Sequence, residues 1–157
     1  MLRELGKEED LERELAFTMS LLQRDVMNNS AWSQRAFLMD LRSGSGAEVD
    51  WSAEFAMTTE SIKKCVENEA SWAYLAYVAR NSDDRVRDDL YPDFIGAMLD
   101  EHRDSVEVGS AAFGYYKDLR SAETDDIRRE TWTVALKLLR DTLVRKDPRR
   151  AHRWNLA

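Results

Sequence analysis

The stretch that decides the fold is Asn28–Phe37, with the sequence NNSAWSQRAF, and it returns in altered form at Asn68–Tyr77 as NEASWAYLAY. Trp72 follows Trp32 by 40 residues. The same offset relates a long series of further pairs: Glu14 and Glu54, Leu15 and Phe55, Ala16 and Ala56, Phe17 and Met57, Leu22 and Ile62, Val26 and Val66, Ala36 and Ala76. Matches on this scale at one offset indicate an internal structural repeat, which is typical of helical solenoids.

Each repeat predicts a pair of helices. In the first repeat, apolar residues recur at steps of three and four from Leu15 to Val26, which is the spacing of one helix face. Asn28 and Asn29 follow, and we expect them to form the turn, because asparagine tolerates the left-handed conformation that ends a helix and also caps the next one. The sequence therefore predicts one hairpin over residues 11–41 and, after the link SGSGAE, a second over 51–80.

The period is weaker beyond residue 80, but helical patterns continue. Pro92 is suited to the first turn of a helix, and a third hairpin is predicted over 92–120. A fourth is predicted over 122–157, with a long helix that ends at Asp147-Pro148 and a last short helix that turns Trp154 inward. We expect a single all-α domain over 1–157, a right-handed α-α superhelix of helical hairpins similar to tetratricopeptide repeats.

The two tryptophans and the arginine of the repeat have different expected roles. Trp32 and Trp72 lie one turn into the second helix of each pair, where we expect them to be buried between the helices. Arg35 has no counterpart in the next repeat, where the equivalent residue is Leu75. Arg35 is therefore either a solvated helix charge or the partner of an acidic residue on a neighbouring helix.

Composition limits the functional classes. The chain has 157 residues, of which 43% are hydrophobic and 34% charged, as in a globular domain with a core. Its net charge of −7 disfavours nucleic acid as the main partner. A single cysteine, Cys65, cannot form an internal disulfide, and no apolar run is long enough to cross a bilayer. These features favour a cytoplasmic location.

The sequence holds no complete catalytic constellation. It lacks the phosphate-binding glycine loops and the zinc motif H-E-x-x-H, and its two histidines, His102 and His152, are far apart. Cys65 is expected to be a buried structural thiol rather than a nucleophile. Lys137–Arg153 holds seven basic residues and two acidic ones, so this segment is either an anion-binding patch or a solvated helix face.

The motifs resemble those of one family. The pattern N-x-x-x-W-x-x-R, here Asn28, Trp32 and Arg35, resembles the repeat of protein prenyltransferase α subunits. ELAFTMSLLQRDVMNNSAWSQRAF and CVENEASWAYLAYV are similar to successive repeats in the C-terminal half of the α subunit shared by farnesyltransferase and geranylgeranyltransferase type I. ALKLLRDTLVRKDPRRAHRWNL resembles the family's terminal segment, whose D-x-x-R-x-x-x-W motif falls on Asp147 and Trp154.

The resemblance implies a heterodimeric enzyme. Such enzymes transfer a farnesyl or geranylgeranyl group from its diphosphate to a cysteine near the C-terminus of a target protein. The β subunit holds the catalytic zinc and most of the substrate pocket, and magnesium assists departure of the diphosphate. The α subunit is a crescent of hairpins around the β subunit, so this chain is expected to be a scaffold.

The family's diphosphate-facing residues lie in earlier repeats that have no match here. We therefore assign no catalytic, cofactor-binding or metal-binding residue to this chain, and we do not expect activity from the chain alone. The residues that resemble the repeat motifs are predicted to form the scaffold and the interface with the β subunit: Asn28, Trp32, Arg35, Asn68, Trp72, Asp147, Arg150 and Trp154.

Two other interpretations remain open at this point. The chain could be a stand-alone helical-repeat adaptor with no β subunit, or an α-like subunit of Rab geranylgeranyltransferase, whose repeats share the tryptophan motif. The resemblance also implies that a further hairpin packs on the first helix. Without one, we expect Leu15, Phe17 or Leu22 to be exposed and the chain to self-associate or to be marginally stable.

Overall fold

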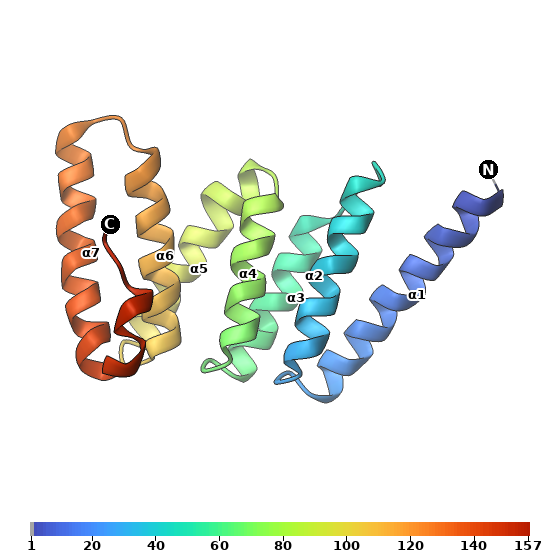
Figure 1. Ribbon diagram of the computed structural model, residues 1–157, viewed down its shortest axis with the longest axis horizontal. Coiled ribbons are helices and arrows are strands. Elements are labelled where there is room, and N and C mark those ends of the chain that lie inside the picture. Colours follow the sequence, from blue (N-terminus) through green and yellow to red (C-terminus); the bar gives the residue numbers. More distant parts are fainter. Residues whose placement is uncertain (1) are drawn as a thin grey trace. The chain divides into compact units, whose positions relative to one another are not determined.

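A computed structural model describes residues 2–157, with side chains described for residues 7–157. The chain is helical throughout this part and contains no strand there (Figure 1). The elements in chain order are α1 Leu2–Arg24, α2 Asn29–Gly44, α3 Trp51–Lys64, α4 Glu69–Asn81, η1 Arg85–Leu90, α5 Tyr91–Glu101, α6 Val106–Ala122, α7 Asp126–Lys146 and η2 Pro148–Arg153. The predicted all-α fold of helical repeats is confirmed.

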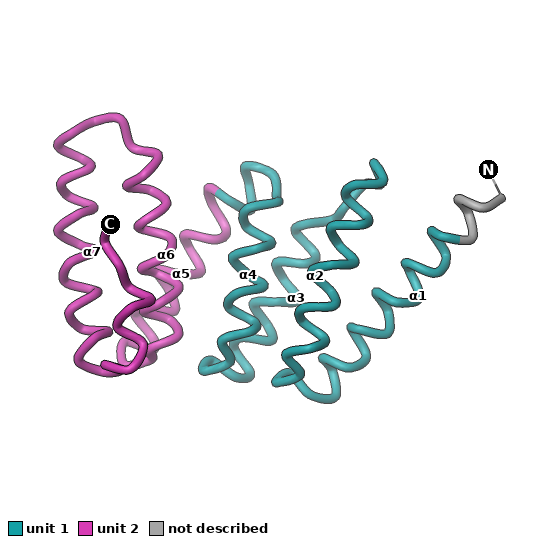
Figure 2. Tube along the Cα trace, viewed as in Figure 1, with its two compact units in different colours: residues 1–87 teal, residues 88–157 magenta. Residues whose placement is uncertain are grey.

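The chain forms two compact units, coloured separately in Figure 2. Unit 1 is Met1–Arg87 and contains α1 to α4, and unit 2 is Asp88–Ala157 and contains α5, α6, α7 and η2. The expectation that the chain is a single domain stays a prediction.

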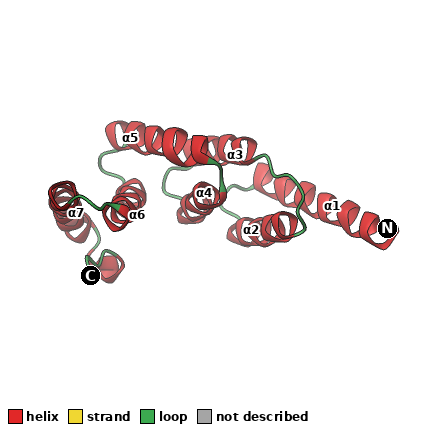
Figure 3. Cartoon of the chain, turned by 90° about the horizontal axis from the view of Figure 1, so that it is seen from above, coloured by secondary structure: helices red, strands yellow, loops and turns green. Residues whose placement is uncertain are grey.

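Unit 1 consists of two helical hairpins stacked in register. Within it, α1 and α3 form one layer, and α2 and α4 form the other, with α2 packed directly on α4 (Figure 3). Leu15 and Leu22 on α1 are buried, as are Phe55 and Ile62, which lie at the same positions of α3. The same offset of 40 residues therefore places the same face of each first helix against its second helix.

The turns differ in one respect from the sequence prediction. Asn28 and Asn68 do cap the second helices, because their side-chain oxygens accept hydrogen bonds from the backbone N–H of Ala31 at 3.0 Å and of Ala70 at 3.3 Å. Neither asparagine adopts the left-handed conformation, however. In the part of the chain that the structure describes, positive φ is found at Gly46 alone, in the link between α2 and α3. Backbone hydrogen bonds from Asn28 to Asp25 at 3.1 Å and from Asn68 to Cys65 at 3.2 Å close these turns together with the side-chain caps.

The first helix begins earlier than predicted, at Leu2 instead of Leu11. The preceding segment LRELGKEED is rich in residues with high helix propensity and contains no proline, so nothing in it stops the helix. The segment has too few apolar residues to show the steps of three and four that indicate a helix face. The prediction therefore missed this extension.

Unit 2 packs α6 between α5 and α7, and η2 lies against α7. Its core contains Phe113, Leu136, Leu143 and Trp154, all buried. Gly109 on α6 permits the close approach of α7, because a Cβ at this position would come within 2.7 Å of the Leu143 side chain. Burial of Trp154 confirms the inward orientation predicted for it.

Two short elements correct the sequence interpretation. Arg85–Leu90, which lies between the predicted second and third hairpins, forms a π-helix that leads directly into α5. Val86 is its one buried residue. So few apolar residues among polar ones give no periodic pattern, and the sequence therefore does not predict this helix. Pro148–Arg153, predicted as a last α-helix, is a 3₁₀-helix of six residues. A 3₁₀-helix is more tightly wound than an α-helix and is common in short segments of this kind.

Candidate functional site: the repeat-motif clusters

The tryptophans of the repeat make the same contact in both hairpins. Trp32 and Trp72 are buried, as predicted. The indole N–H of Trp32 donates a hydrogen bond to the backbone oxygen of Val26 at 2.8 Å, and that of Trp72 donates to Val66 at 2.7 Å. Each tryptophan thereby ties the start of the second helix to the turn that precedes it.

Arg35 is the centre of a buried polar cluster in unit 1. Its side chain is only 5% exposed. Its guanidinium donates through two nitrogens to the carboxylate of Glu54 on α3, one of them Nε at 2.9 Å. A third nitrogen donates to the backbone oxygen of Leu15 at 3.0 Å and to the hydroxyl of Thr18 at 3.1 Å, both on α1. The ion-pair interpretation of Arg35 is confirmed, and the solvated one is wrong.

Tyr74 completes this cluster from α4. Its hydroxyl donates to Glu54 at 2.8 Å, so one carboxylate joins α2, α3 and α4. Burial raises the pKa of Tyr74, and the negative charge of Glu54 raises it further. Burial lowers the pKa of Arg35, but the hydrogen bond and charge of Glu54 outweigh that effect, and the net shift is upward. The cluster therefore holds arginine charged and tyrosine neutral.

Asn68 links the turns of the two hairpins. Its side-chain amide donates to the backbone oxygen of Val26 at 2.7 Å, and the residue is only 1% exposed. Val26 thus accepts hydrogen bonds from Trp32 of its own hairpin and from Asn68 of the next. Asn28, the equivalent residue of the first hairpin, is half-buried.

The C-terminal motif forms a second polar cluster, in unit 2. Arg150 in η2 donates to Asp147 at 2.5 Å and to Glu107 on α6 at 2.6 Å. The indole N–H of Trp154 donates to the hydroxyl of Ser110, also on α6, at 3.0 Å. The hydrogen bond from Arg150 lowers the pKa of Asp147, and the two carboxylates raise the pKa of Arg150. The motif therefore fixes the end of the chain to α6.

All eight motif residues predicted from the sequence make structural contacts, but the structure does not bring them into one site. Those of unit 1 and unit 2 belong to separate clusters. Sequence analysis did not identify the partners Glu54, Tyr74 and Glu107. A signal was available for Glu54, because it pairs with Glu14 at the repeat offset, and an acidic residue retained in both repeats is a candidate partner for a motif arginine.

Cys65, expected to be buried, is half-buried at the end of α3, with its sulfur 3.4 Å from that of Met27. Among residues 7–157, no group of three or more histidine, cysteine, aspartate or glutamate side chains is placed to hold a metal ion. Each polar group in the two clusters is engaged in holding helices together. The two clusters therefore connect the helices within each unit.

The basic C-terminal segment is partly neutralised within the fold. Besides Arg150, Lys146 donates to the backbone of Arg103 at 2.9 Å and forms an ion pair with Asp104 at 3.1 Å.

None of the helices described is both long and apolar enough to span a membrane.

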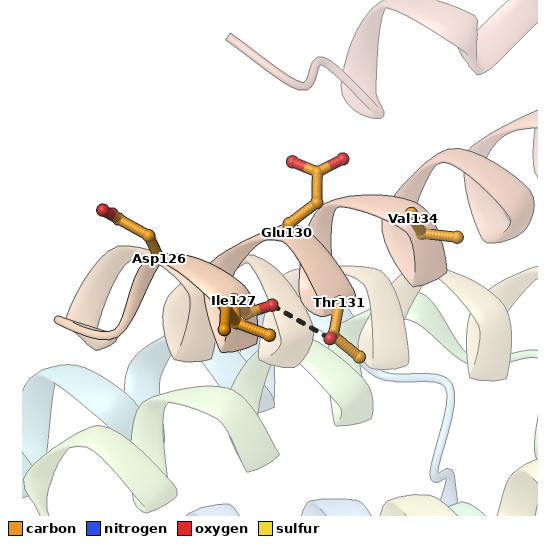
Figure 4. Close-up of a pocket in the computed structure, with 5 residues that line it drawn as sticks. All are labelled: Asp126, Ile127, Glu130, Thr131 and Val134. Carbon is orange, nitrogen blue, oxygen red and sulfur yellow. Dashed lines mark hydrogen bonds between the residues drawn. The ribbon is translucent and has the colours of Figure 1, made fainter.

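Two surface features of the described residues could contact another molecule, one on α7 and one on α2. One depression lies along α7, and all the residues that line it come from this single helix (Figure 4). They are Asp126, Ile127, Glu130, Thr131 and Val134. On α2, Phe37 and Leu41 are 61% and 49% exposed and lie one helical turn apart. Contiguous exposed apolar patches mark surfaces that contact another protein, whereas single exposed apolar side chains are ordinary.

Comparison with known protein families identifies the repeat. Residues 11–42 match the protein prenyltransferase alpha subunit repeat. This segment covers most of α1, most of α2 and the turn between them, with Asn28, Trp32 and Arg35. No curated protein matches the chain. The chain therefore carries one repeat of the prenyltransferase α-subunit family, and the resemblance is confirmed for this segment.

Proposed function

We propose that this chain is a scaffold subunit of a heterodimeric protein prenyltransferase in the cytoplasm, of the farnesyltransferase or geranylgeranyltransferase type I kind. Its partner is a catalytic β subunit that transfers the isoprenoid from its diphosphate to a cysteine near the C-terminus of a target protein. Zinc and magnesium act in the β subunit and the assembled enzyme. The chain alone has no activity.

The observation that carries this proposal is the family repeat at residues 11–42 together with the use made of its polar motif residues. Trp32 and Arg35 are buried, and both are engaged in contacts between helices. Residues used in this way hold the hairpins together, which supports a scaffold function for the chain.

We place the contact with the β subunit on the layer formed by α2 and α4. Phe37 and Leu41 supply an exposed apolar pair there. Beside them, Asp40 accepts a hydrogen bond from the Tyr77 hydroxyl at 2.7 Å, which fixes α2 to α4. A rigid helix pair with apolar side chains on its surface suits an interface whose core excludes water.

Co-expression with a prenyltransferase β subunit, followed by size-exclusion chromatography with light scattering, tests the proposal. We expect a one-to-one complex with the natural chain. The double variant Phe37→Asp/Leu41→Asp should lose it, because charged groups would be buried at the contact. Phe17→Asp is the matched control, since Phe17 is 52% exposed but lies on α1 and should leave the complex intact.

Each outcome decides between the interpretations. A complex lost in the double variant and kept in the control supports the scaffold function, and the pair is then assayed for transfer of farnesyl and of geranylgeranyl groups. A complex with a Rab-type β subunit alone selects the related Rab enzyme. No complex with any β subunit overturns the proposal and leaves the stand-alone adaptor.

A further inference from the structure

The long helix of unit 2, α7, has a second apolar stripe besides the one that packs in the core. Leu136 and Leu143 belong to the core of the unit and are buried. On the opposite side of the helix lie Ile127, Val134 and Leu138, which are 80%, 49% and 67% exposed. Three large apolar side chains that share one exposed helix face form a patch, and such a patch marks a contact with another protein.

The exposed stripe follows a heptad pattern. Steps of four, three and four residues separate Ile127, Thr131, Val134 and Leu138. This spacing is the alternation of d and a positions in a coiled coil. The first three of these residues line one depression along the helix (Figure 4). The hydroxyl of Thr131 already donates to the backbone oxygen of Ile127 at 3.0 Å, so its burial leaves no donor unpaired. We call these four residues the outer stripe.

We propose that the outer stripe is the contact between two copies of this chain, whose α7 helices pack antiparallel. In an antiparallel pair, the a positions of one helix face the d positions of the other. Leu138 then packs on Ile127 of the second copy, and Thr131 packs on Val134. Every residue of the stripe is covered by a residue of the same stripe, as a two-fold contact requires.

The charges beside the stripe support a second copy as the occupant. Glu130 and Lys137 are exposed, and both occupy g positions at one edge of the stripe. Equal edges meet in an antiparallel pair, so Glu130 of each copy lies beside Lys137 of the other, and two ion pairs form. At the other edge, formed by the e positions, Arg128 meets Ala135, and no like charges come together.

A parallel pair of the same helices lacks these ion pairs. There, the g edge of one helix faces the e edge of the other, which places Glu130 beside Ala135 and Lys137 beside Thr142. Asp141 and Arg145 continue the heptad pattern, and in a parallel pair each would face its own copy. In the antiparallel register they lie past the start of the other α7 and meet no like charge in the stripe. The antiparallel arrangement is therefore favoured.

This contact lies in unit 2 and does not rest on the proposed β subunit, whose contact we place on α2 and α4 in unit 1. Two copies joined through α7 leave the ratio of this chain to a β subunit at one to one. The outer stripe belongs to a single helix, so the contact is small. We therefore expect a weak dimer that forms reversibly with rising protein concentration.

Sedimentation equilibrium of the natural chain at several concentrations tests the dimer. We expect a reversible monomer–dimer equilibrium. Leu138→Asp should abolish it, because the change would bury unpaired charges in the contact. Phe37→Asp is the matched control, since Phe37 is 61% exposed but lies on α2, and this variant should dimerise as the natural chain does. Circular dichroism should show the same helix content in all three chains.

Exchange of charges tests the antiparallel orientation. Glu130→Lys places like charges together at both g contacts and should weaken the dimer roughly tenfold, and Lys137→Glu should do the same. An equimolar mixture of the two variants should regain the affinity of the natural chain, because each charge meets its opposite in the mixed dimer. A general loss of stability in either variant would not be repaired by mixing.

Three results would contradict the proposal. A natural chain that stays monomeric at the highest concentration reached would overturn it. A dimer that survives Leu138→Asp would use another surface and would also overturn it. A dimer lost in Leu138→Asp but indifferent to both charge changes would overturn the antiparallel arrangement.

Discussion

The two arginine motifs use the same chemistry at different depths. Arg35 is almost fully buried and bridges α1 and α3 from its place on α2. Arg150 remains partly exposed and joins η2 to α6 through Glu107. In both cases a tryptophan of the same motif donates its indole N–H to a neighbouring segment. The first motif unites successive hairpins, whereas the second fastens the last segment of the chain.

The difference in burial between the two arginines determines how strongly the stability of each unit depends on its ion pair. A buried pair gains little over apolar residues of the same shape, but the loss of one partner leaves a charge without solvent or counterion. A pair that water reaches loses much less, because solvent screens the remaining charge. Unit 1 should therefore be the more sensitive to disruption of its arginine motif.

The largest expected effect is that of Glu54→Ala. The change removes the carboxylate from Arg35 and Tyr74 together, and it should lower the free energy of unfolding by about 3–5 kcal/mol. Urea unfolding followed by circular dichroism measures it.

The double variant Arg35→Leu/Glu54→Met is the control for that prediction. It replaces the pair with apolar side chains, as Leu75 already does at the arginine position of the next repeat, where it is fully buried. We expect it to recover most of the lost stability. If the double variant were as unstable as Glu54→Ala, shape and not unpaired charge would be the cause.

The corresponding change in unit 2 is Glu107→Ala. It leaves Arg150 without this carboxylate, but the arginine side chain is 25% exposed and keeps its ion pair with Asp147, so we expect a loss of about 1–2 kcal/mol in the free energy of unfolding. The same urea measurement applies. An effect as large as that of Glu54→Ala would remove the distinction between the two motifs.

A smaller effect is expected from Tyr74→Phe. The variant deletes one hydrogen bond to Glu54 and keeps both from Arg35, so about 1 kcal/mol should be lost at pH 7. Gln34→Ala removes the equivalent donor to Glu14 in the first hairpin, where the carboxylate is exposed, and should cost less. Equal losses would show that burial does not strengthen the tyrosine contact.

How far the sequence could predict this structure depends on the range of the interactions involved. The hairpins and the burial of Trp32 and Trp72 follow from periodicity and from a repeat that can be read directly in the chain. Arg35 was left with two interpretations, because its partner lies 19 residues away on another helix. Pairing across helices depends on their register, which local patterns do not encode.

Other features were not predicted because they too depend on contacts between residues far apart in the sequence. The π-helix at Arg85–Leu90 lies in a polar segment that has no recognisable period. Glu107 is one of many acidic residues in the sequence, and only the fold places it beside Arg150. Self-comparison of the repeats is the exception. The offset that located Trp72 also relates Glu14 to Glu54, and it could have marked Glu54 as a partner.

The smallest effect is a dependence of stability on alkaline pH. Since the pKa of Tyr74 is raised in the folded state, its contribution is fully present below the unfolded pKa of about 10 and is lost as pH rises above it. At pH 10.5 we expect a loss of somewhat under 1 kcal/mol from this tyrosine. Urea unfolding between pH 8 and 10.5 should show a weaker decline in Tyr74→Phe than in the natural chain. Tyr116→Phe in unit 2 serves as the matched tyrosine control, and an equal decline in the natural chain and Tyr74→Phe would mean that Glu54 and burial do not hold the proton on Tyr74.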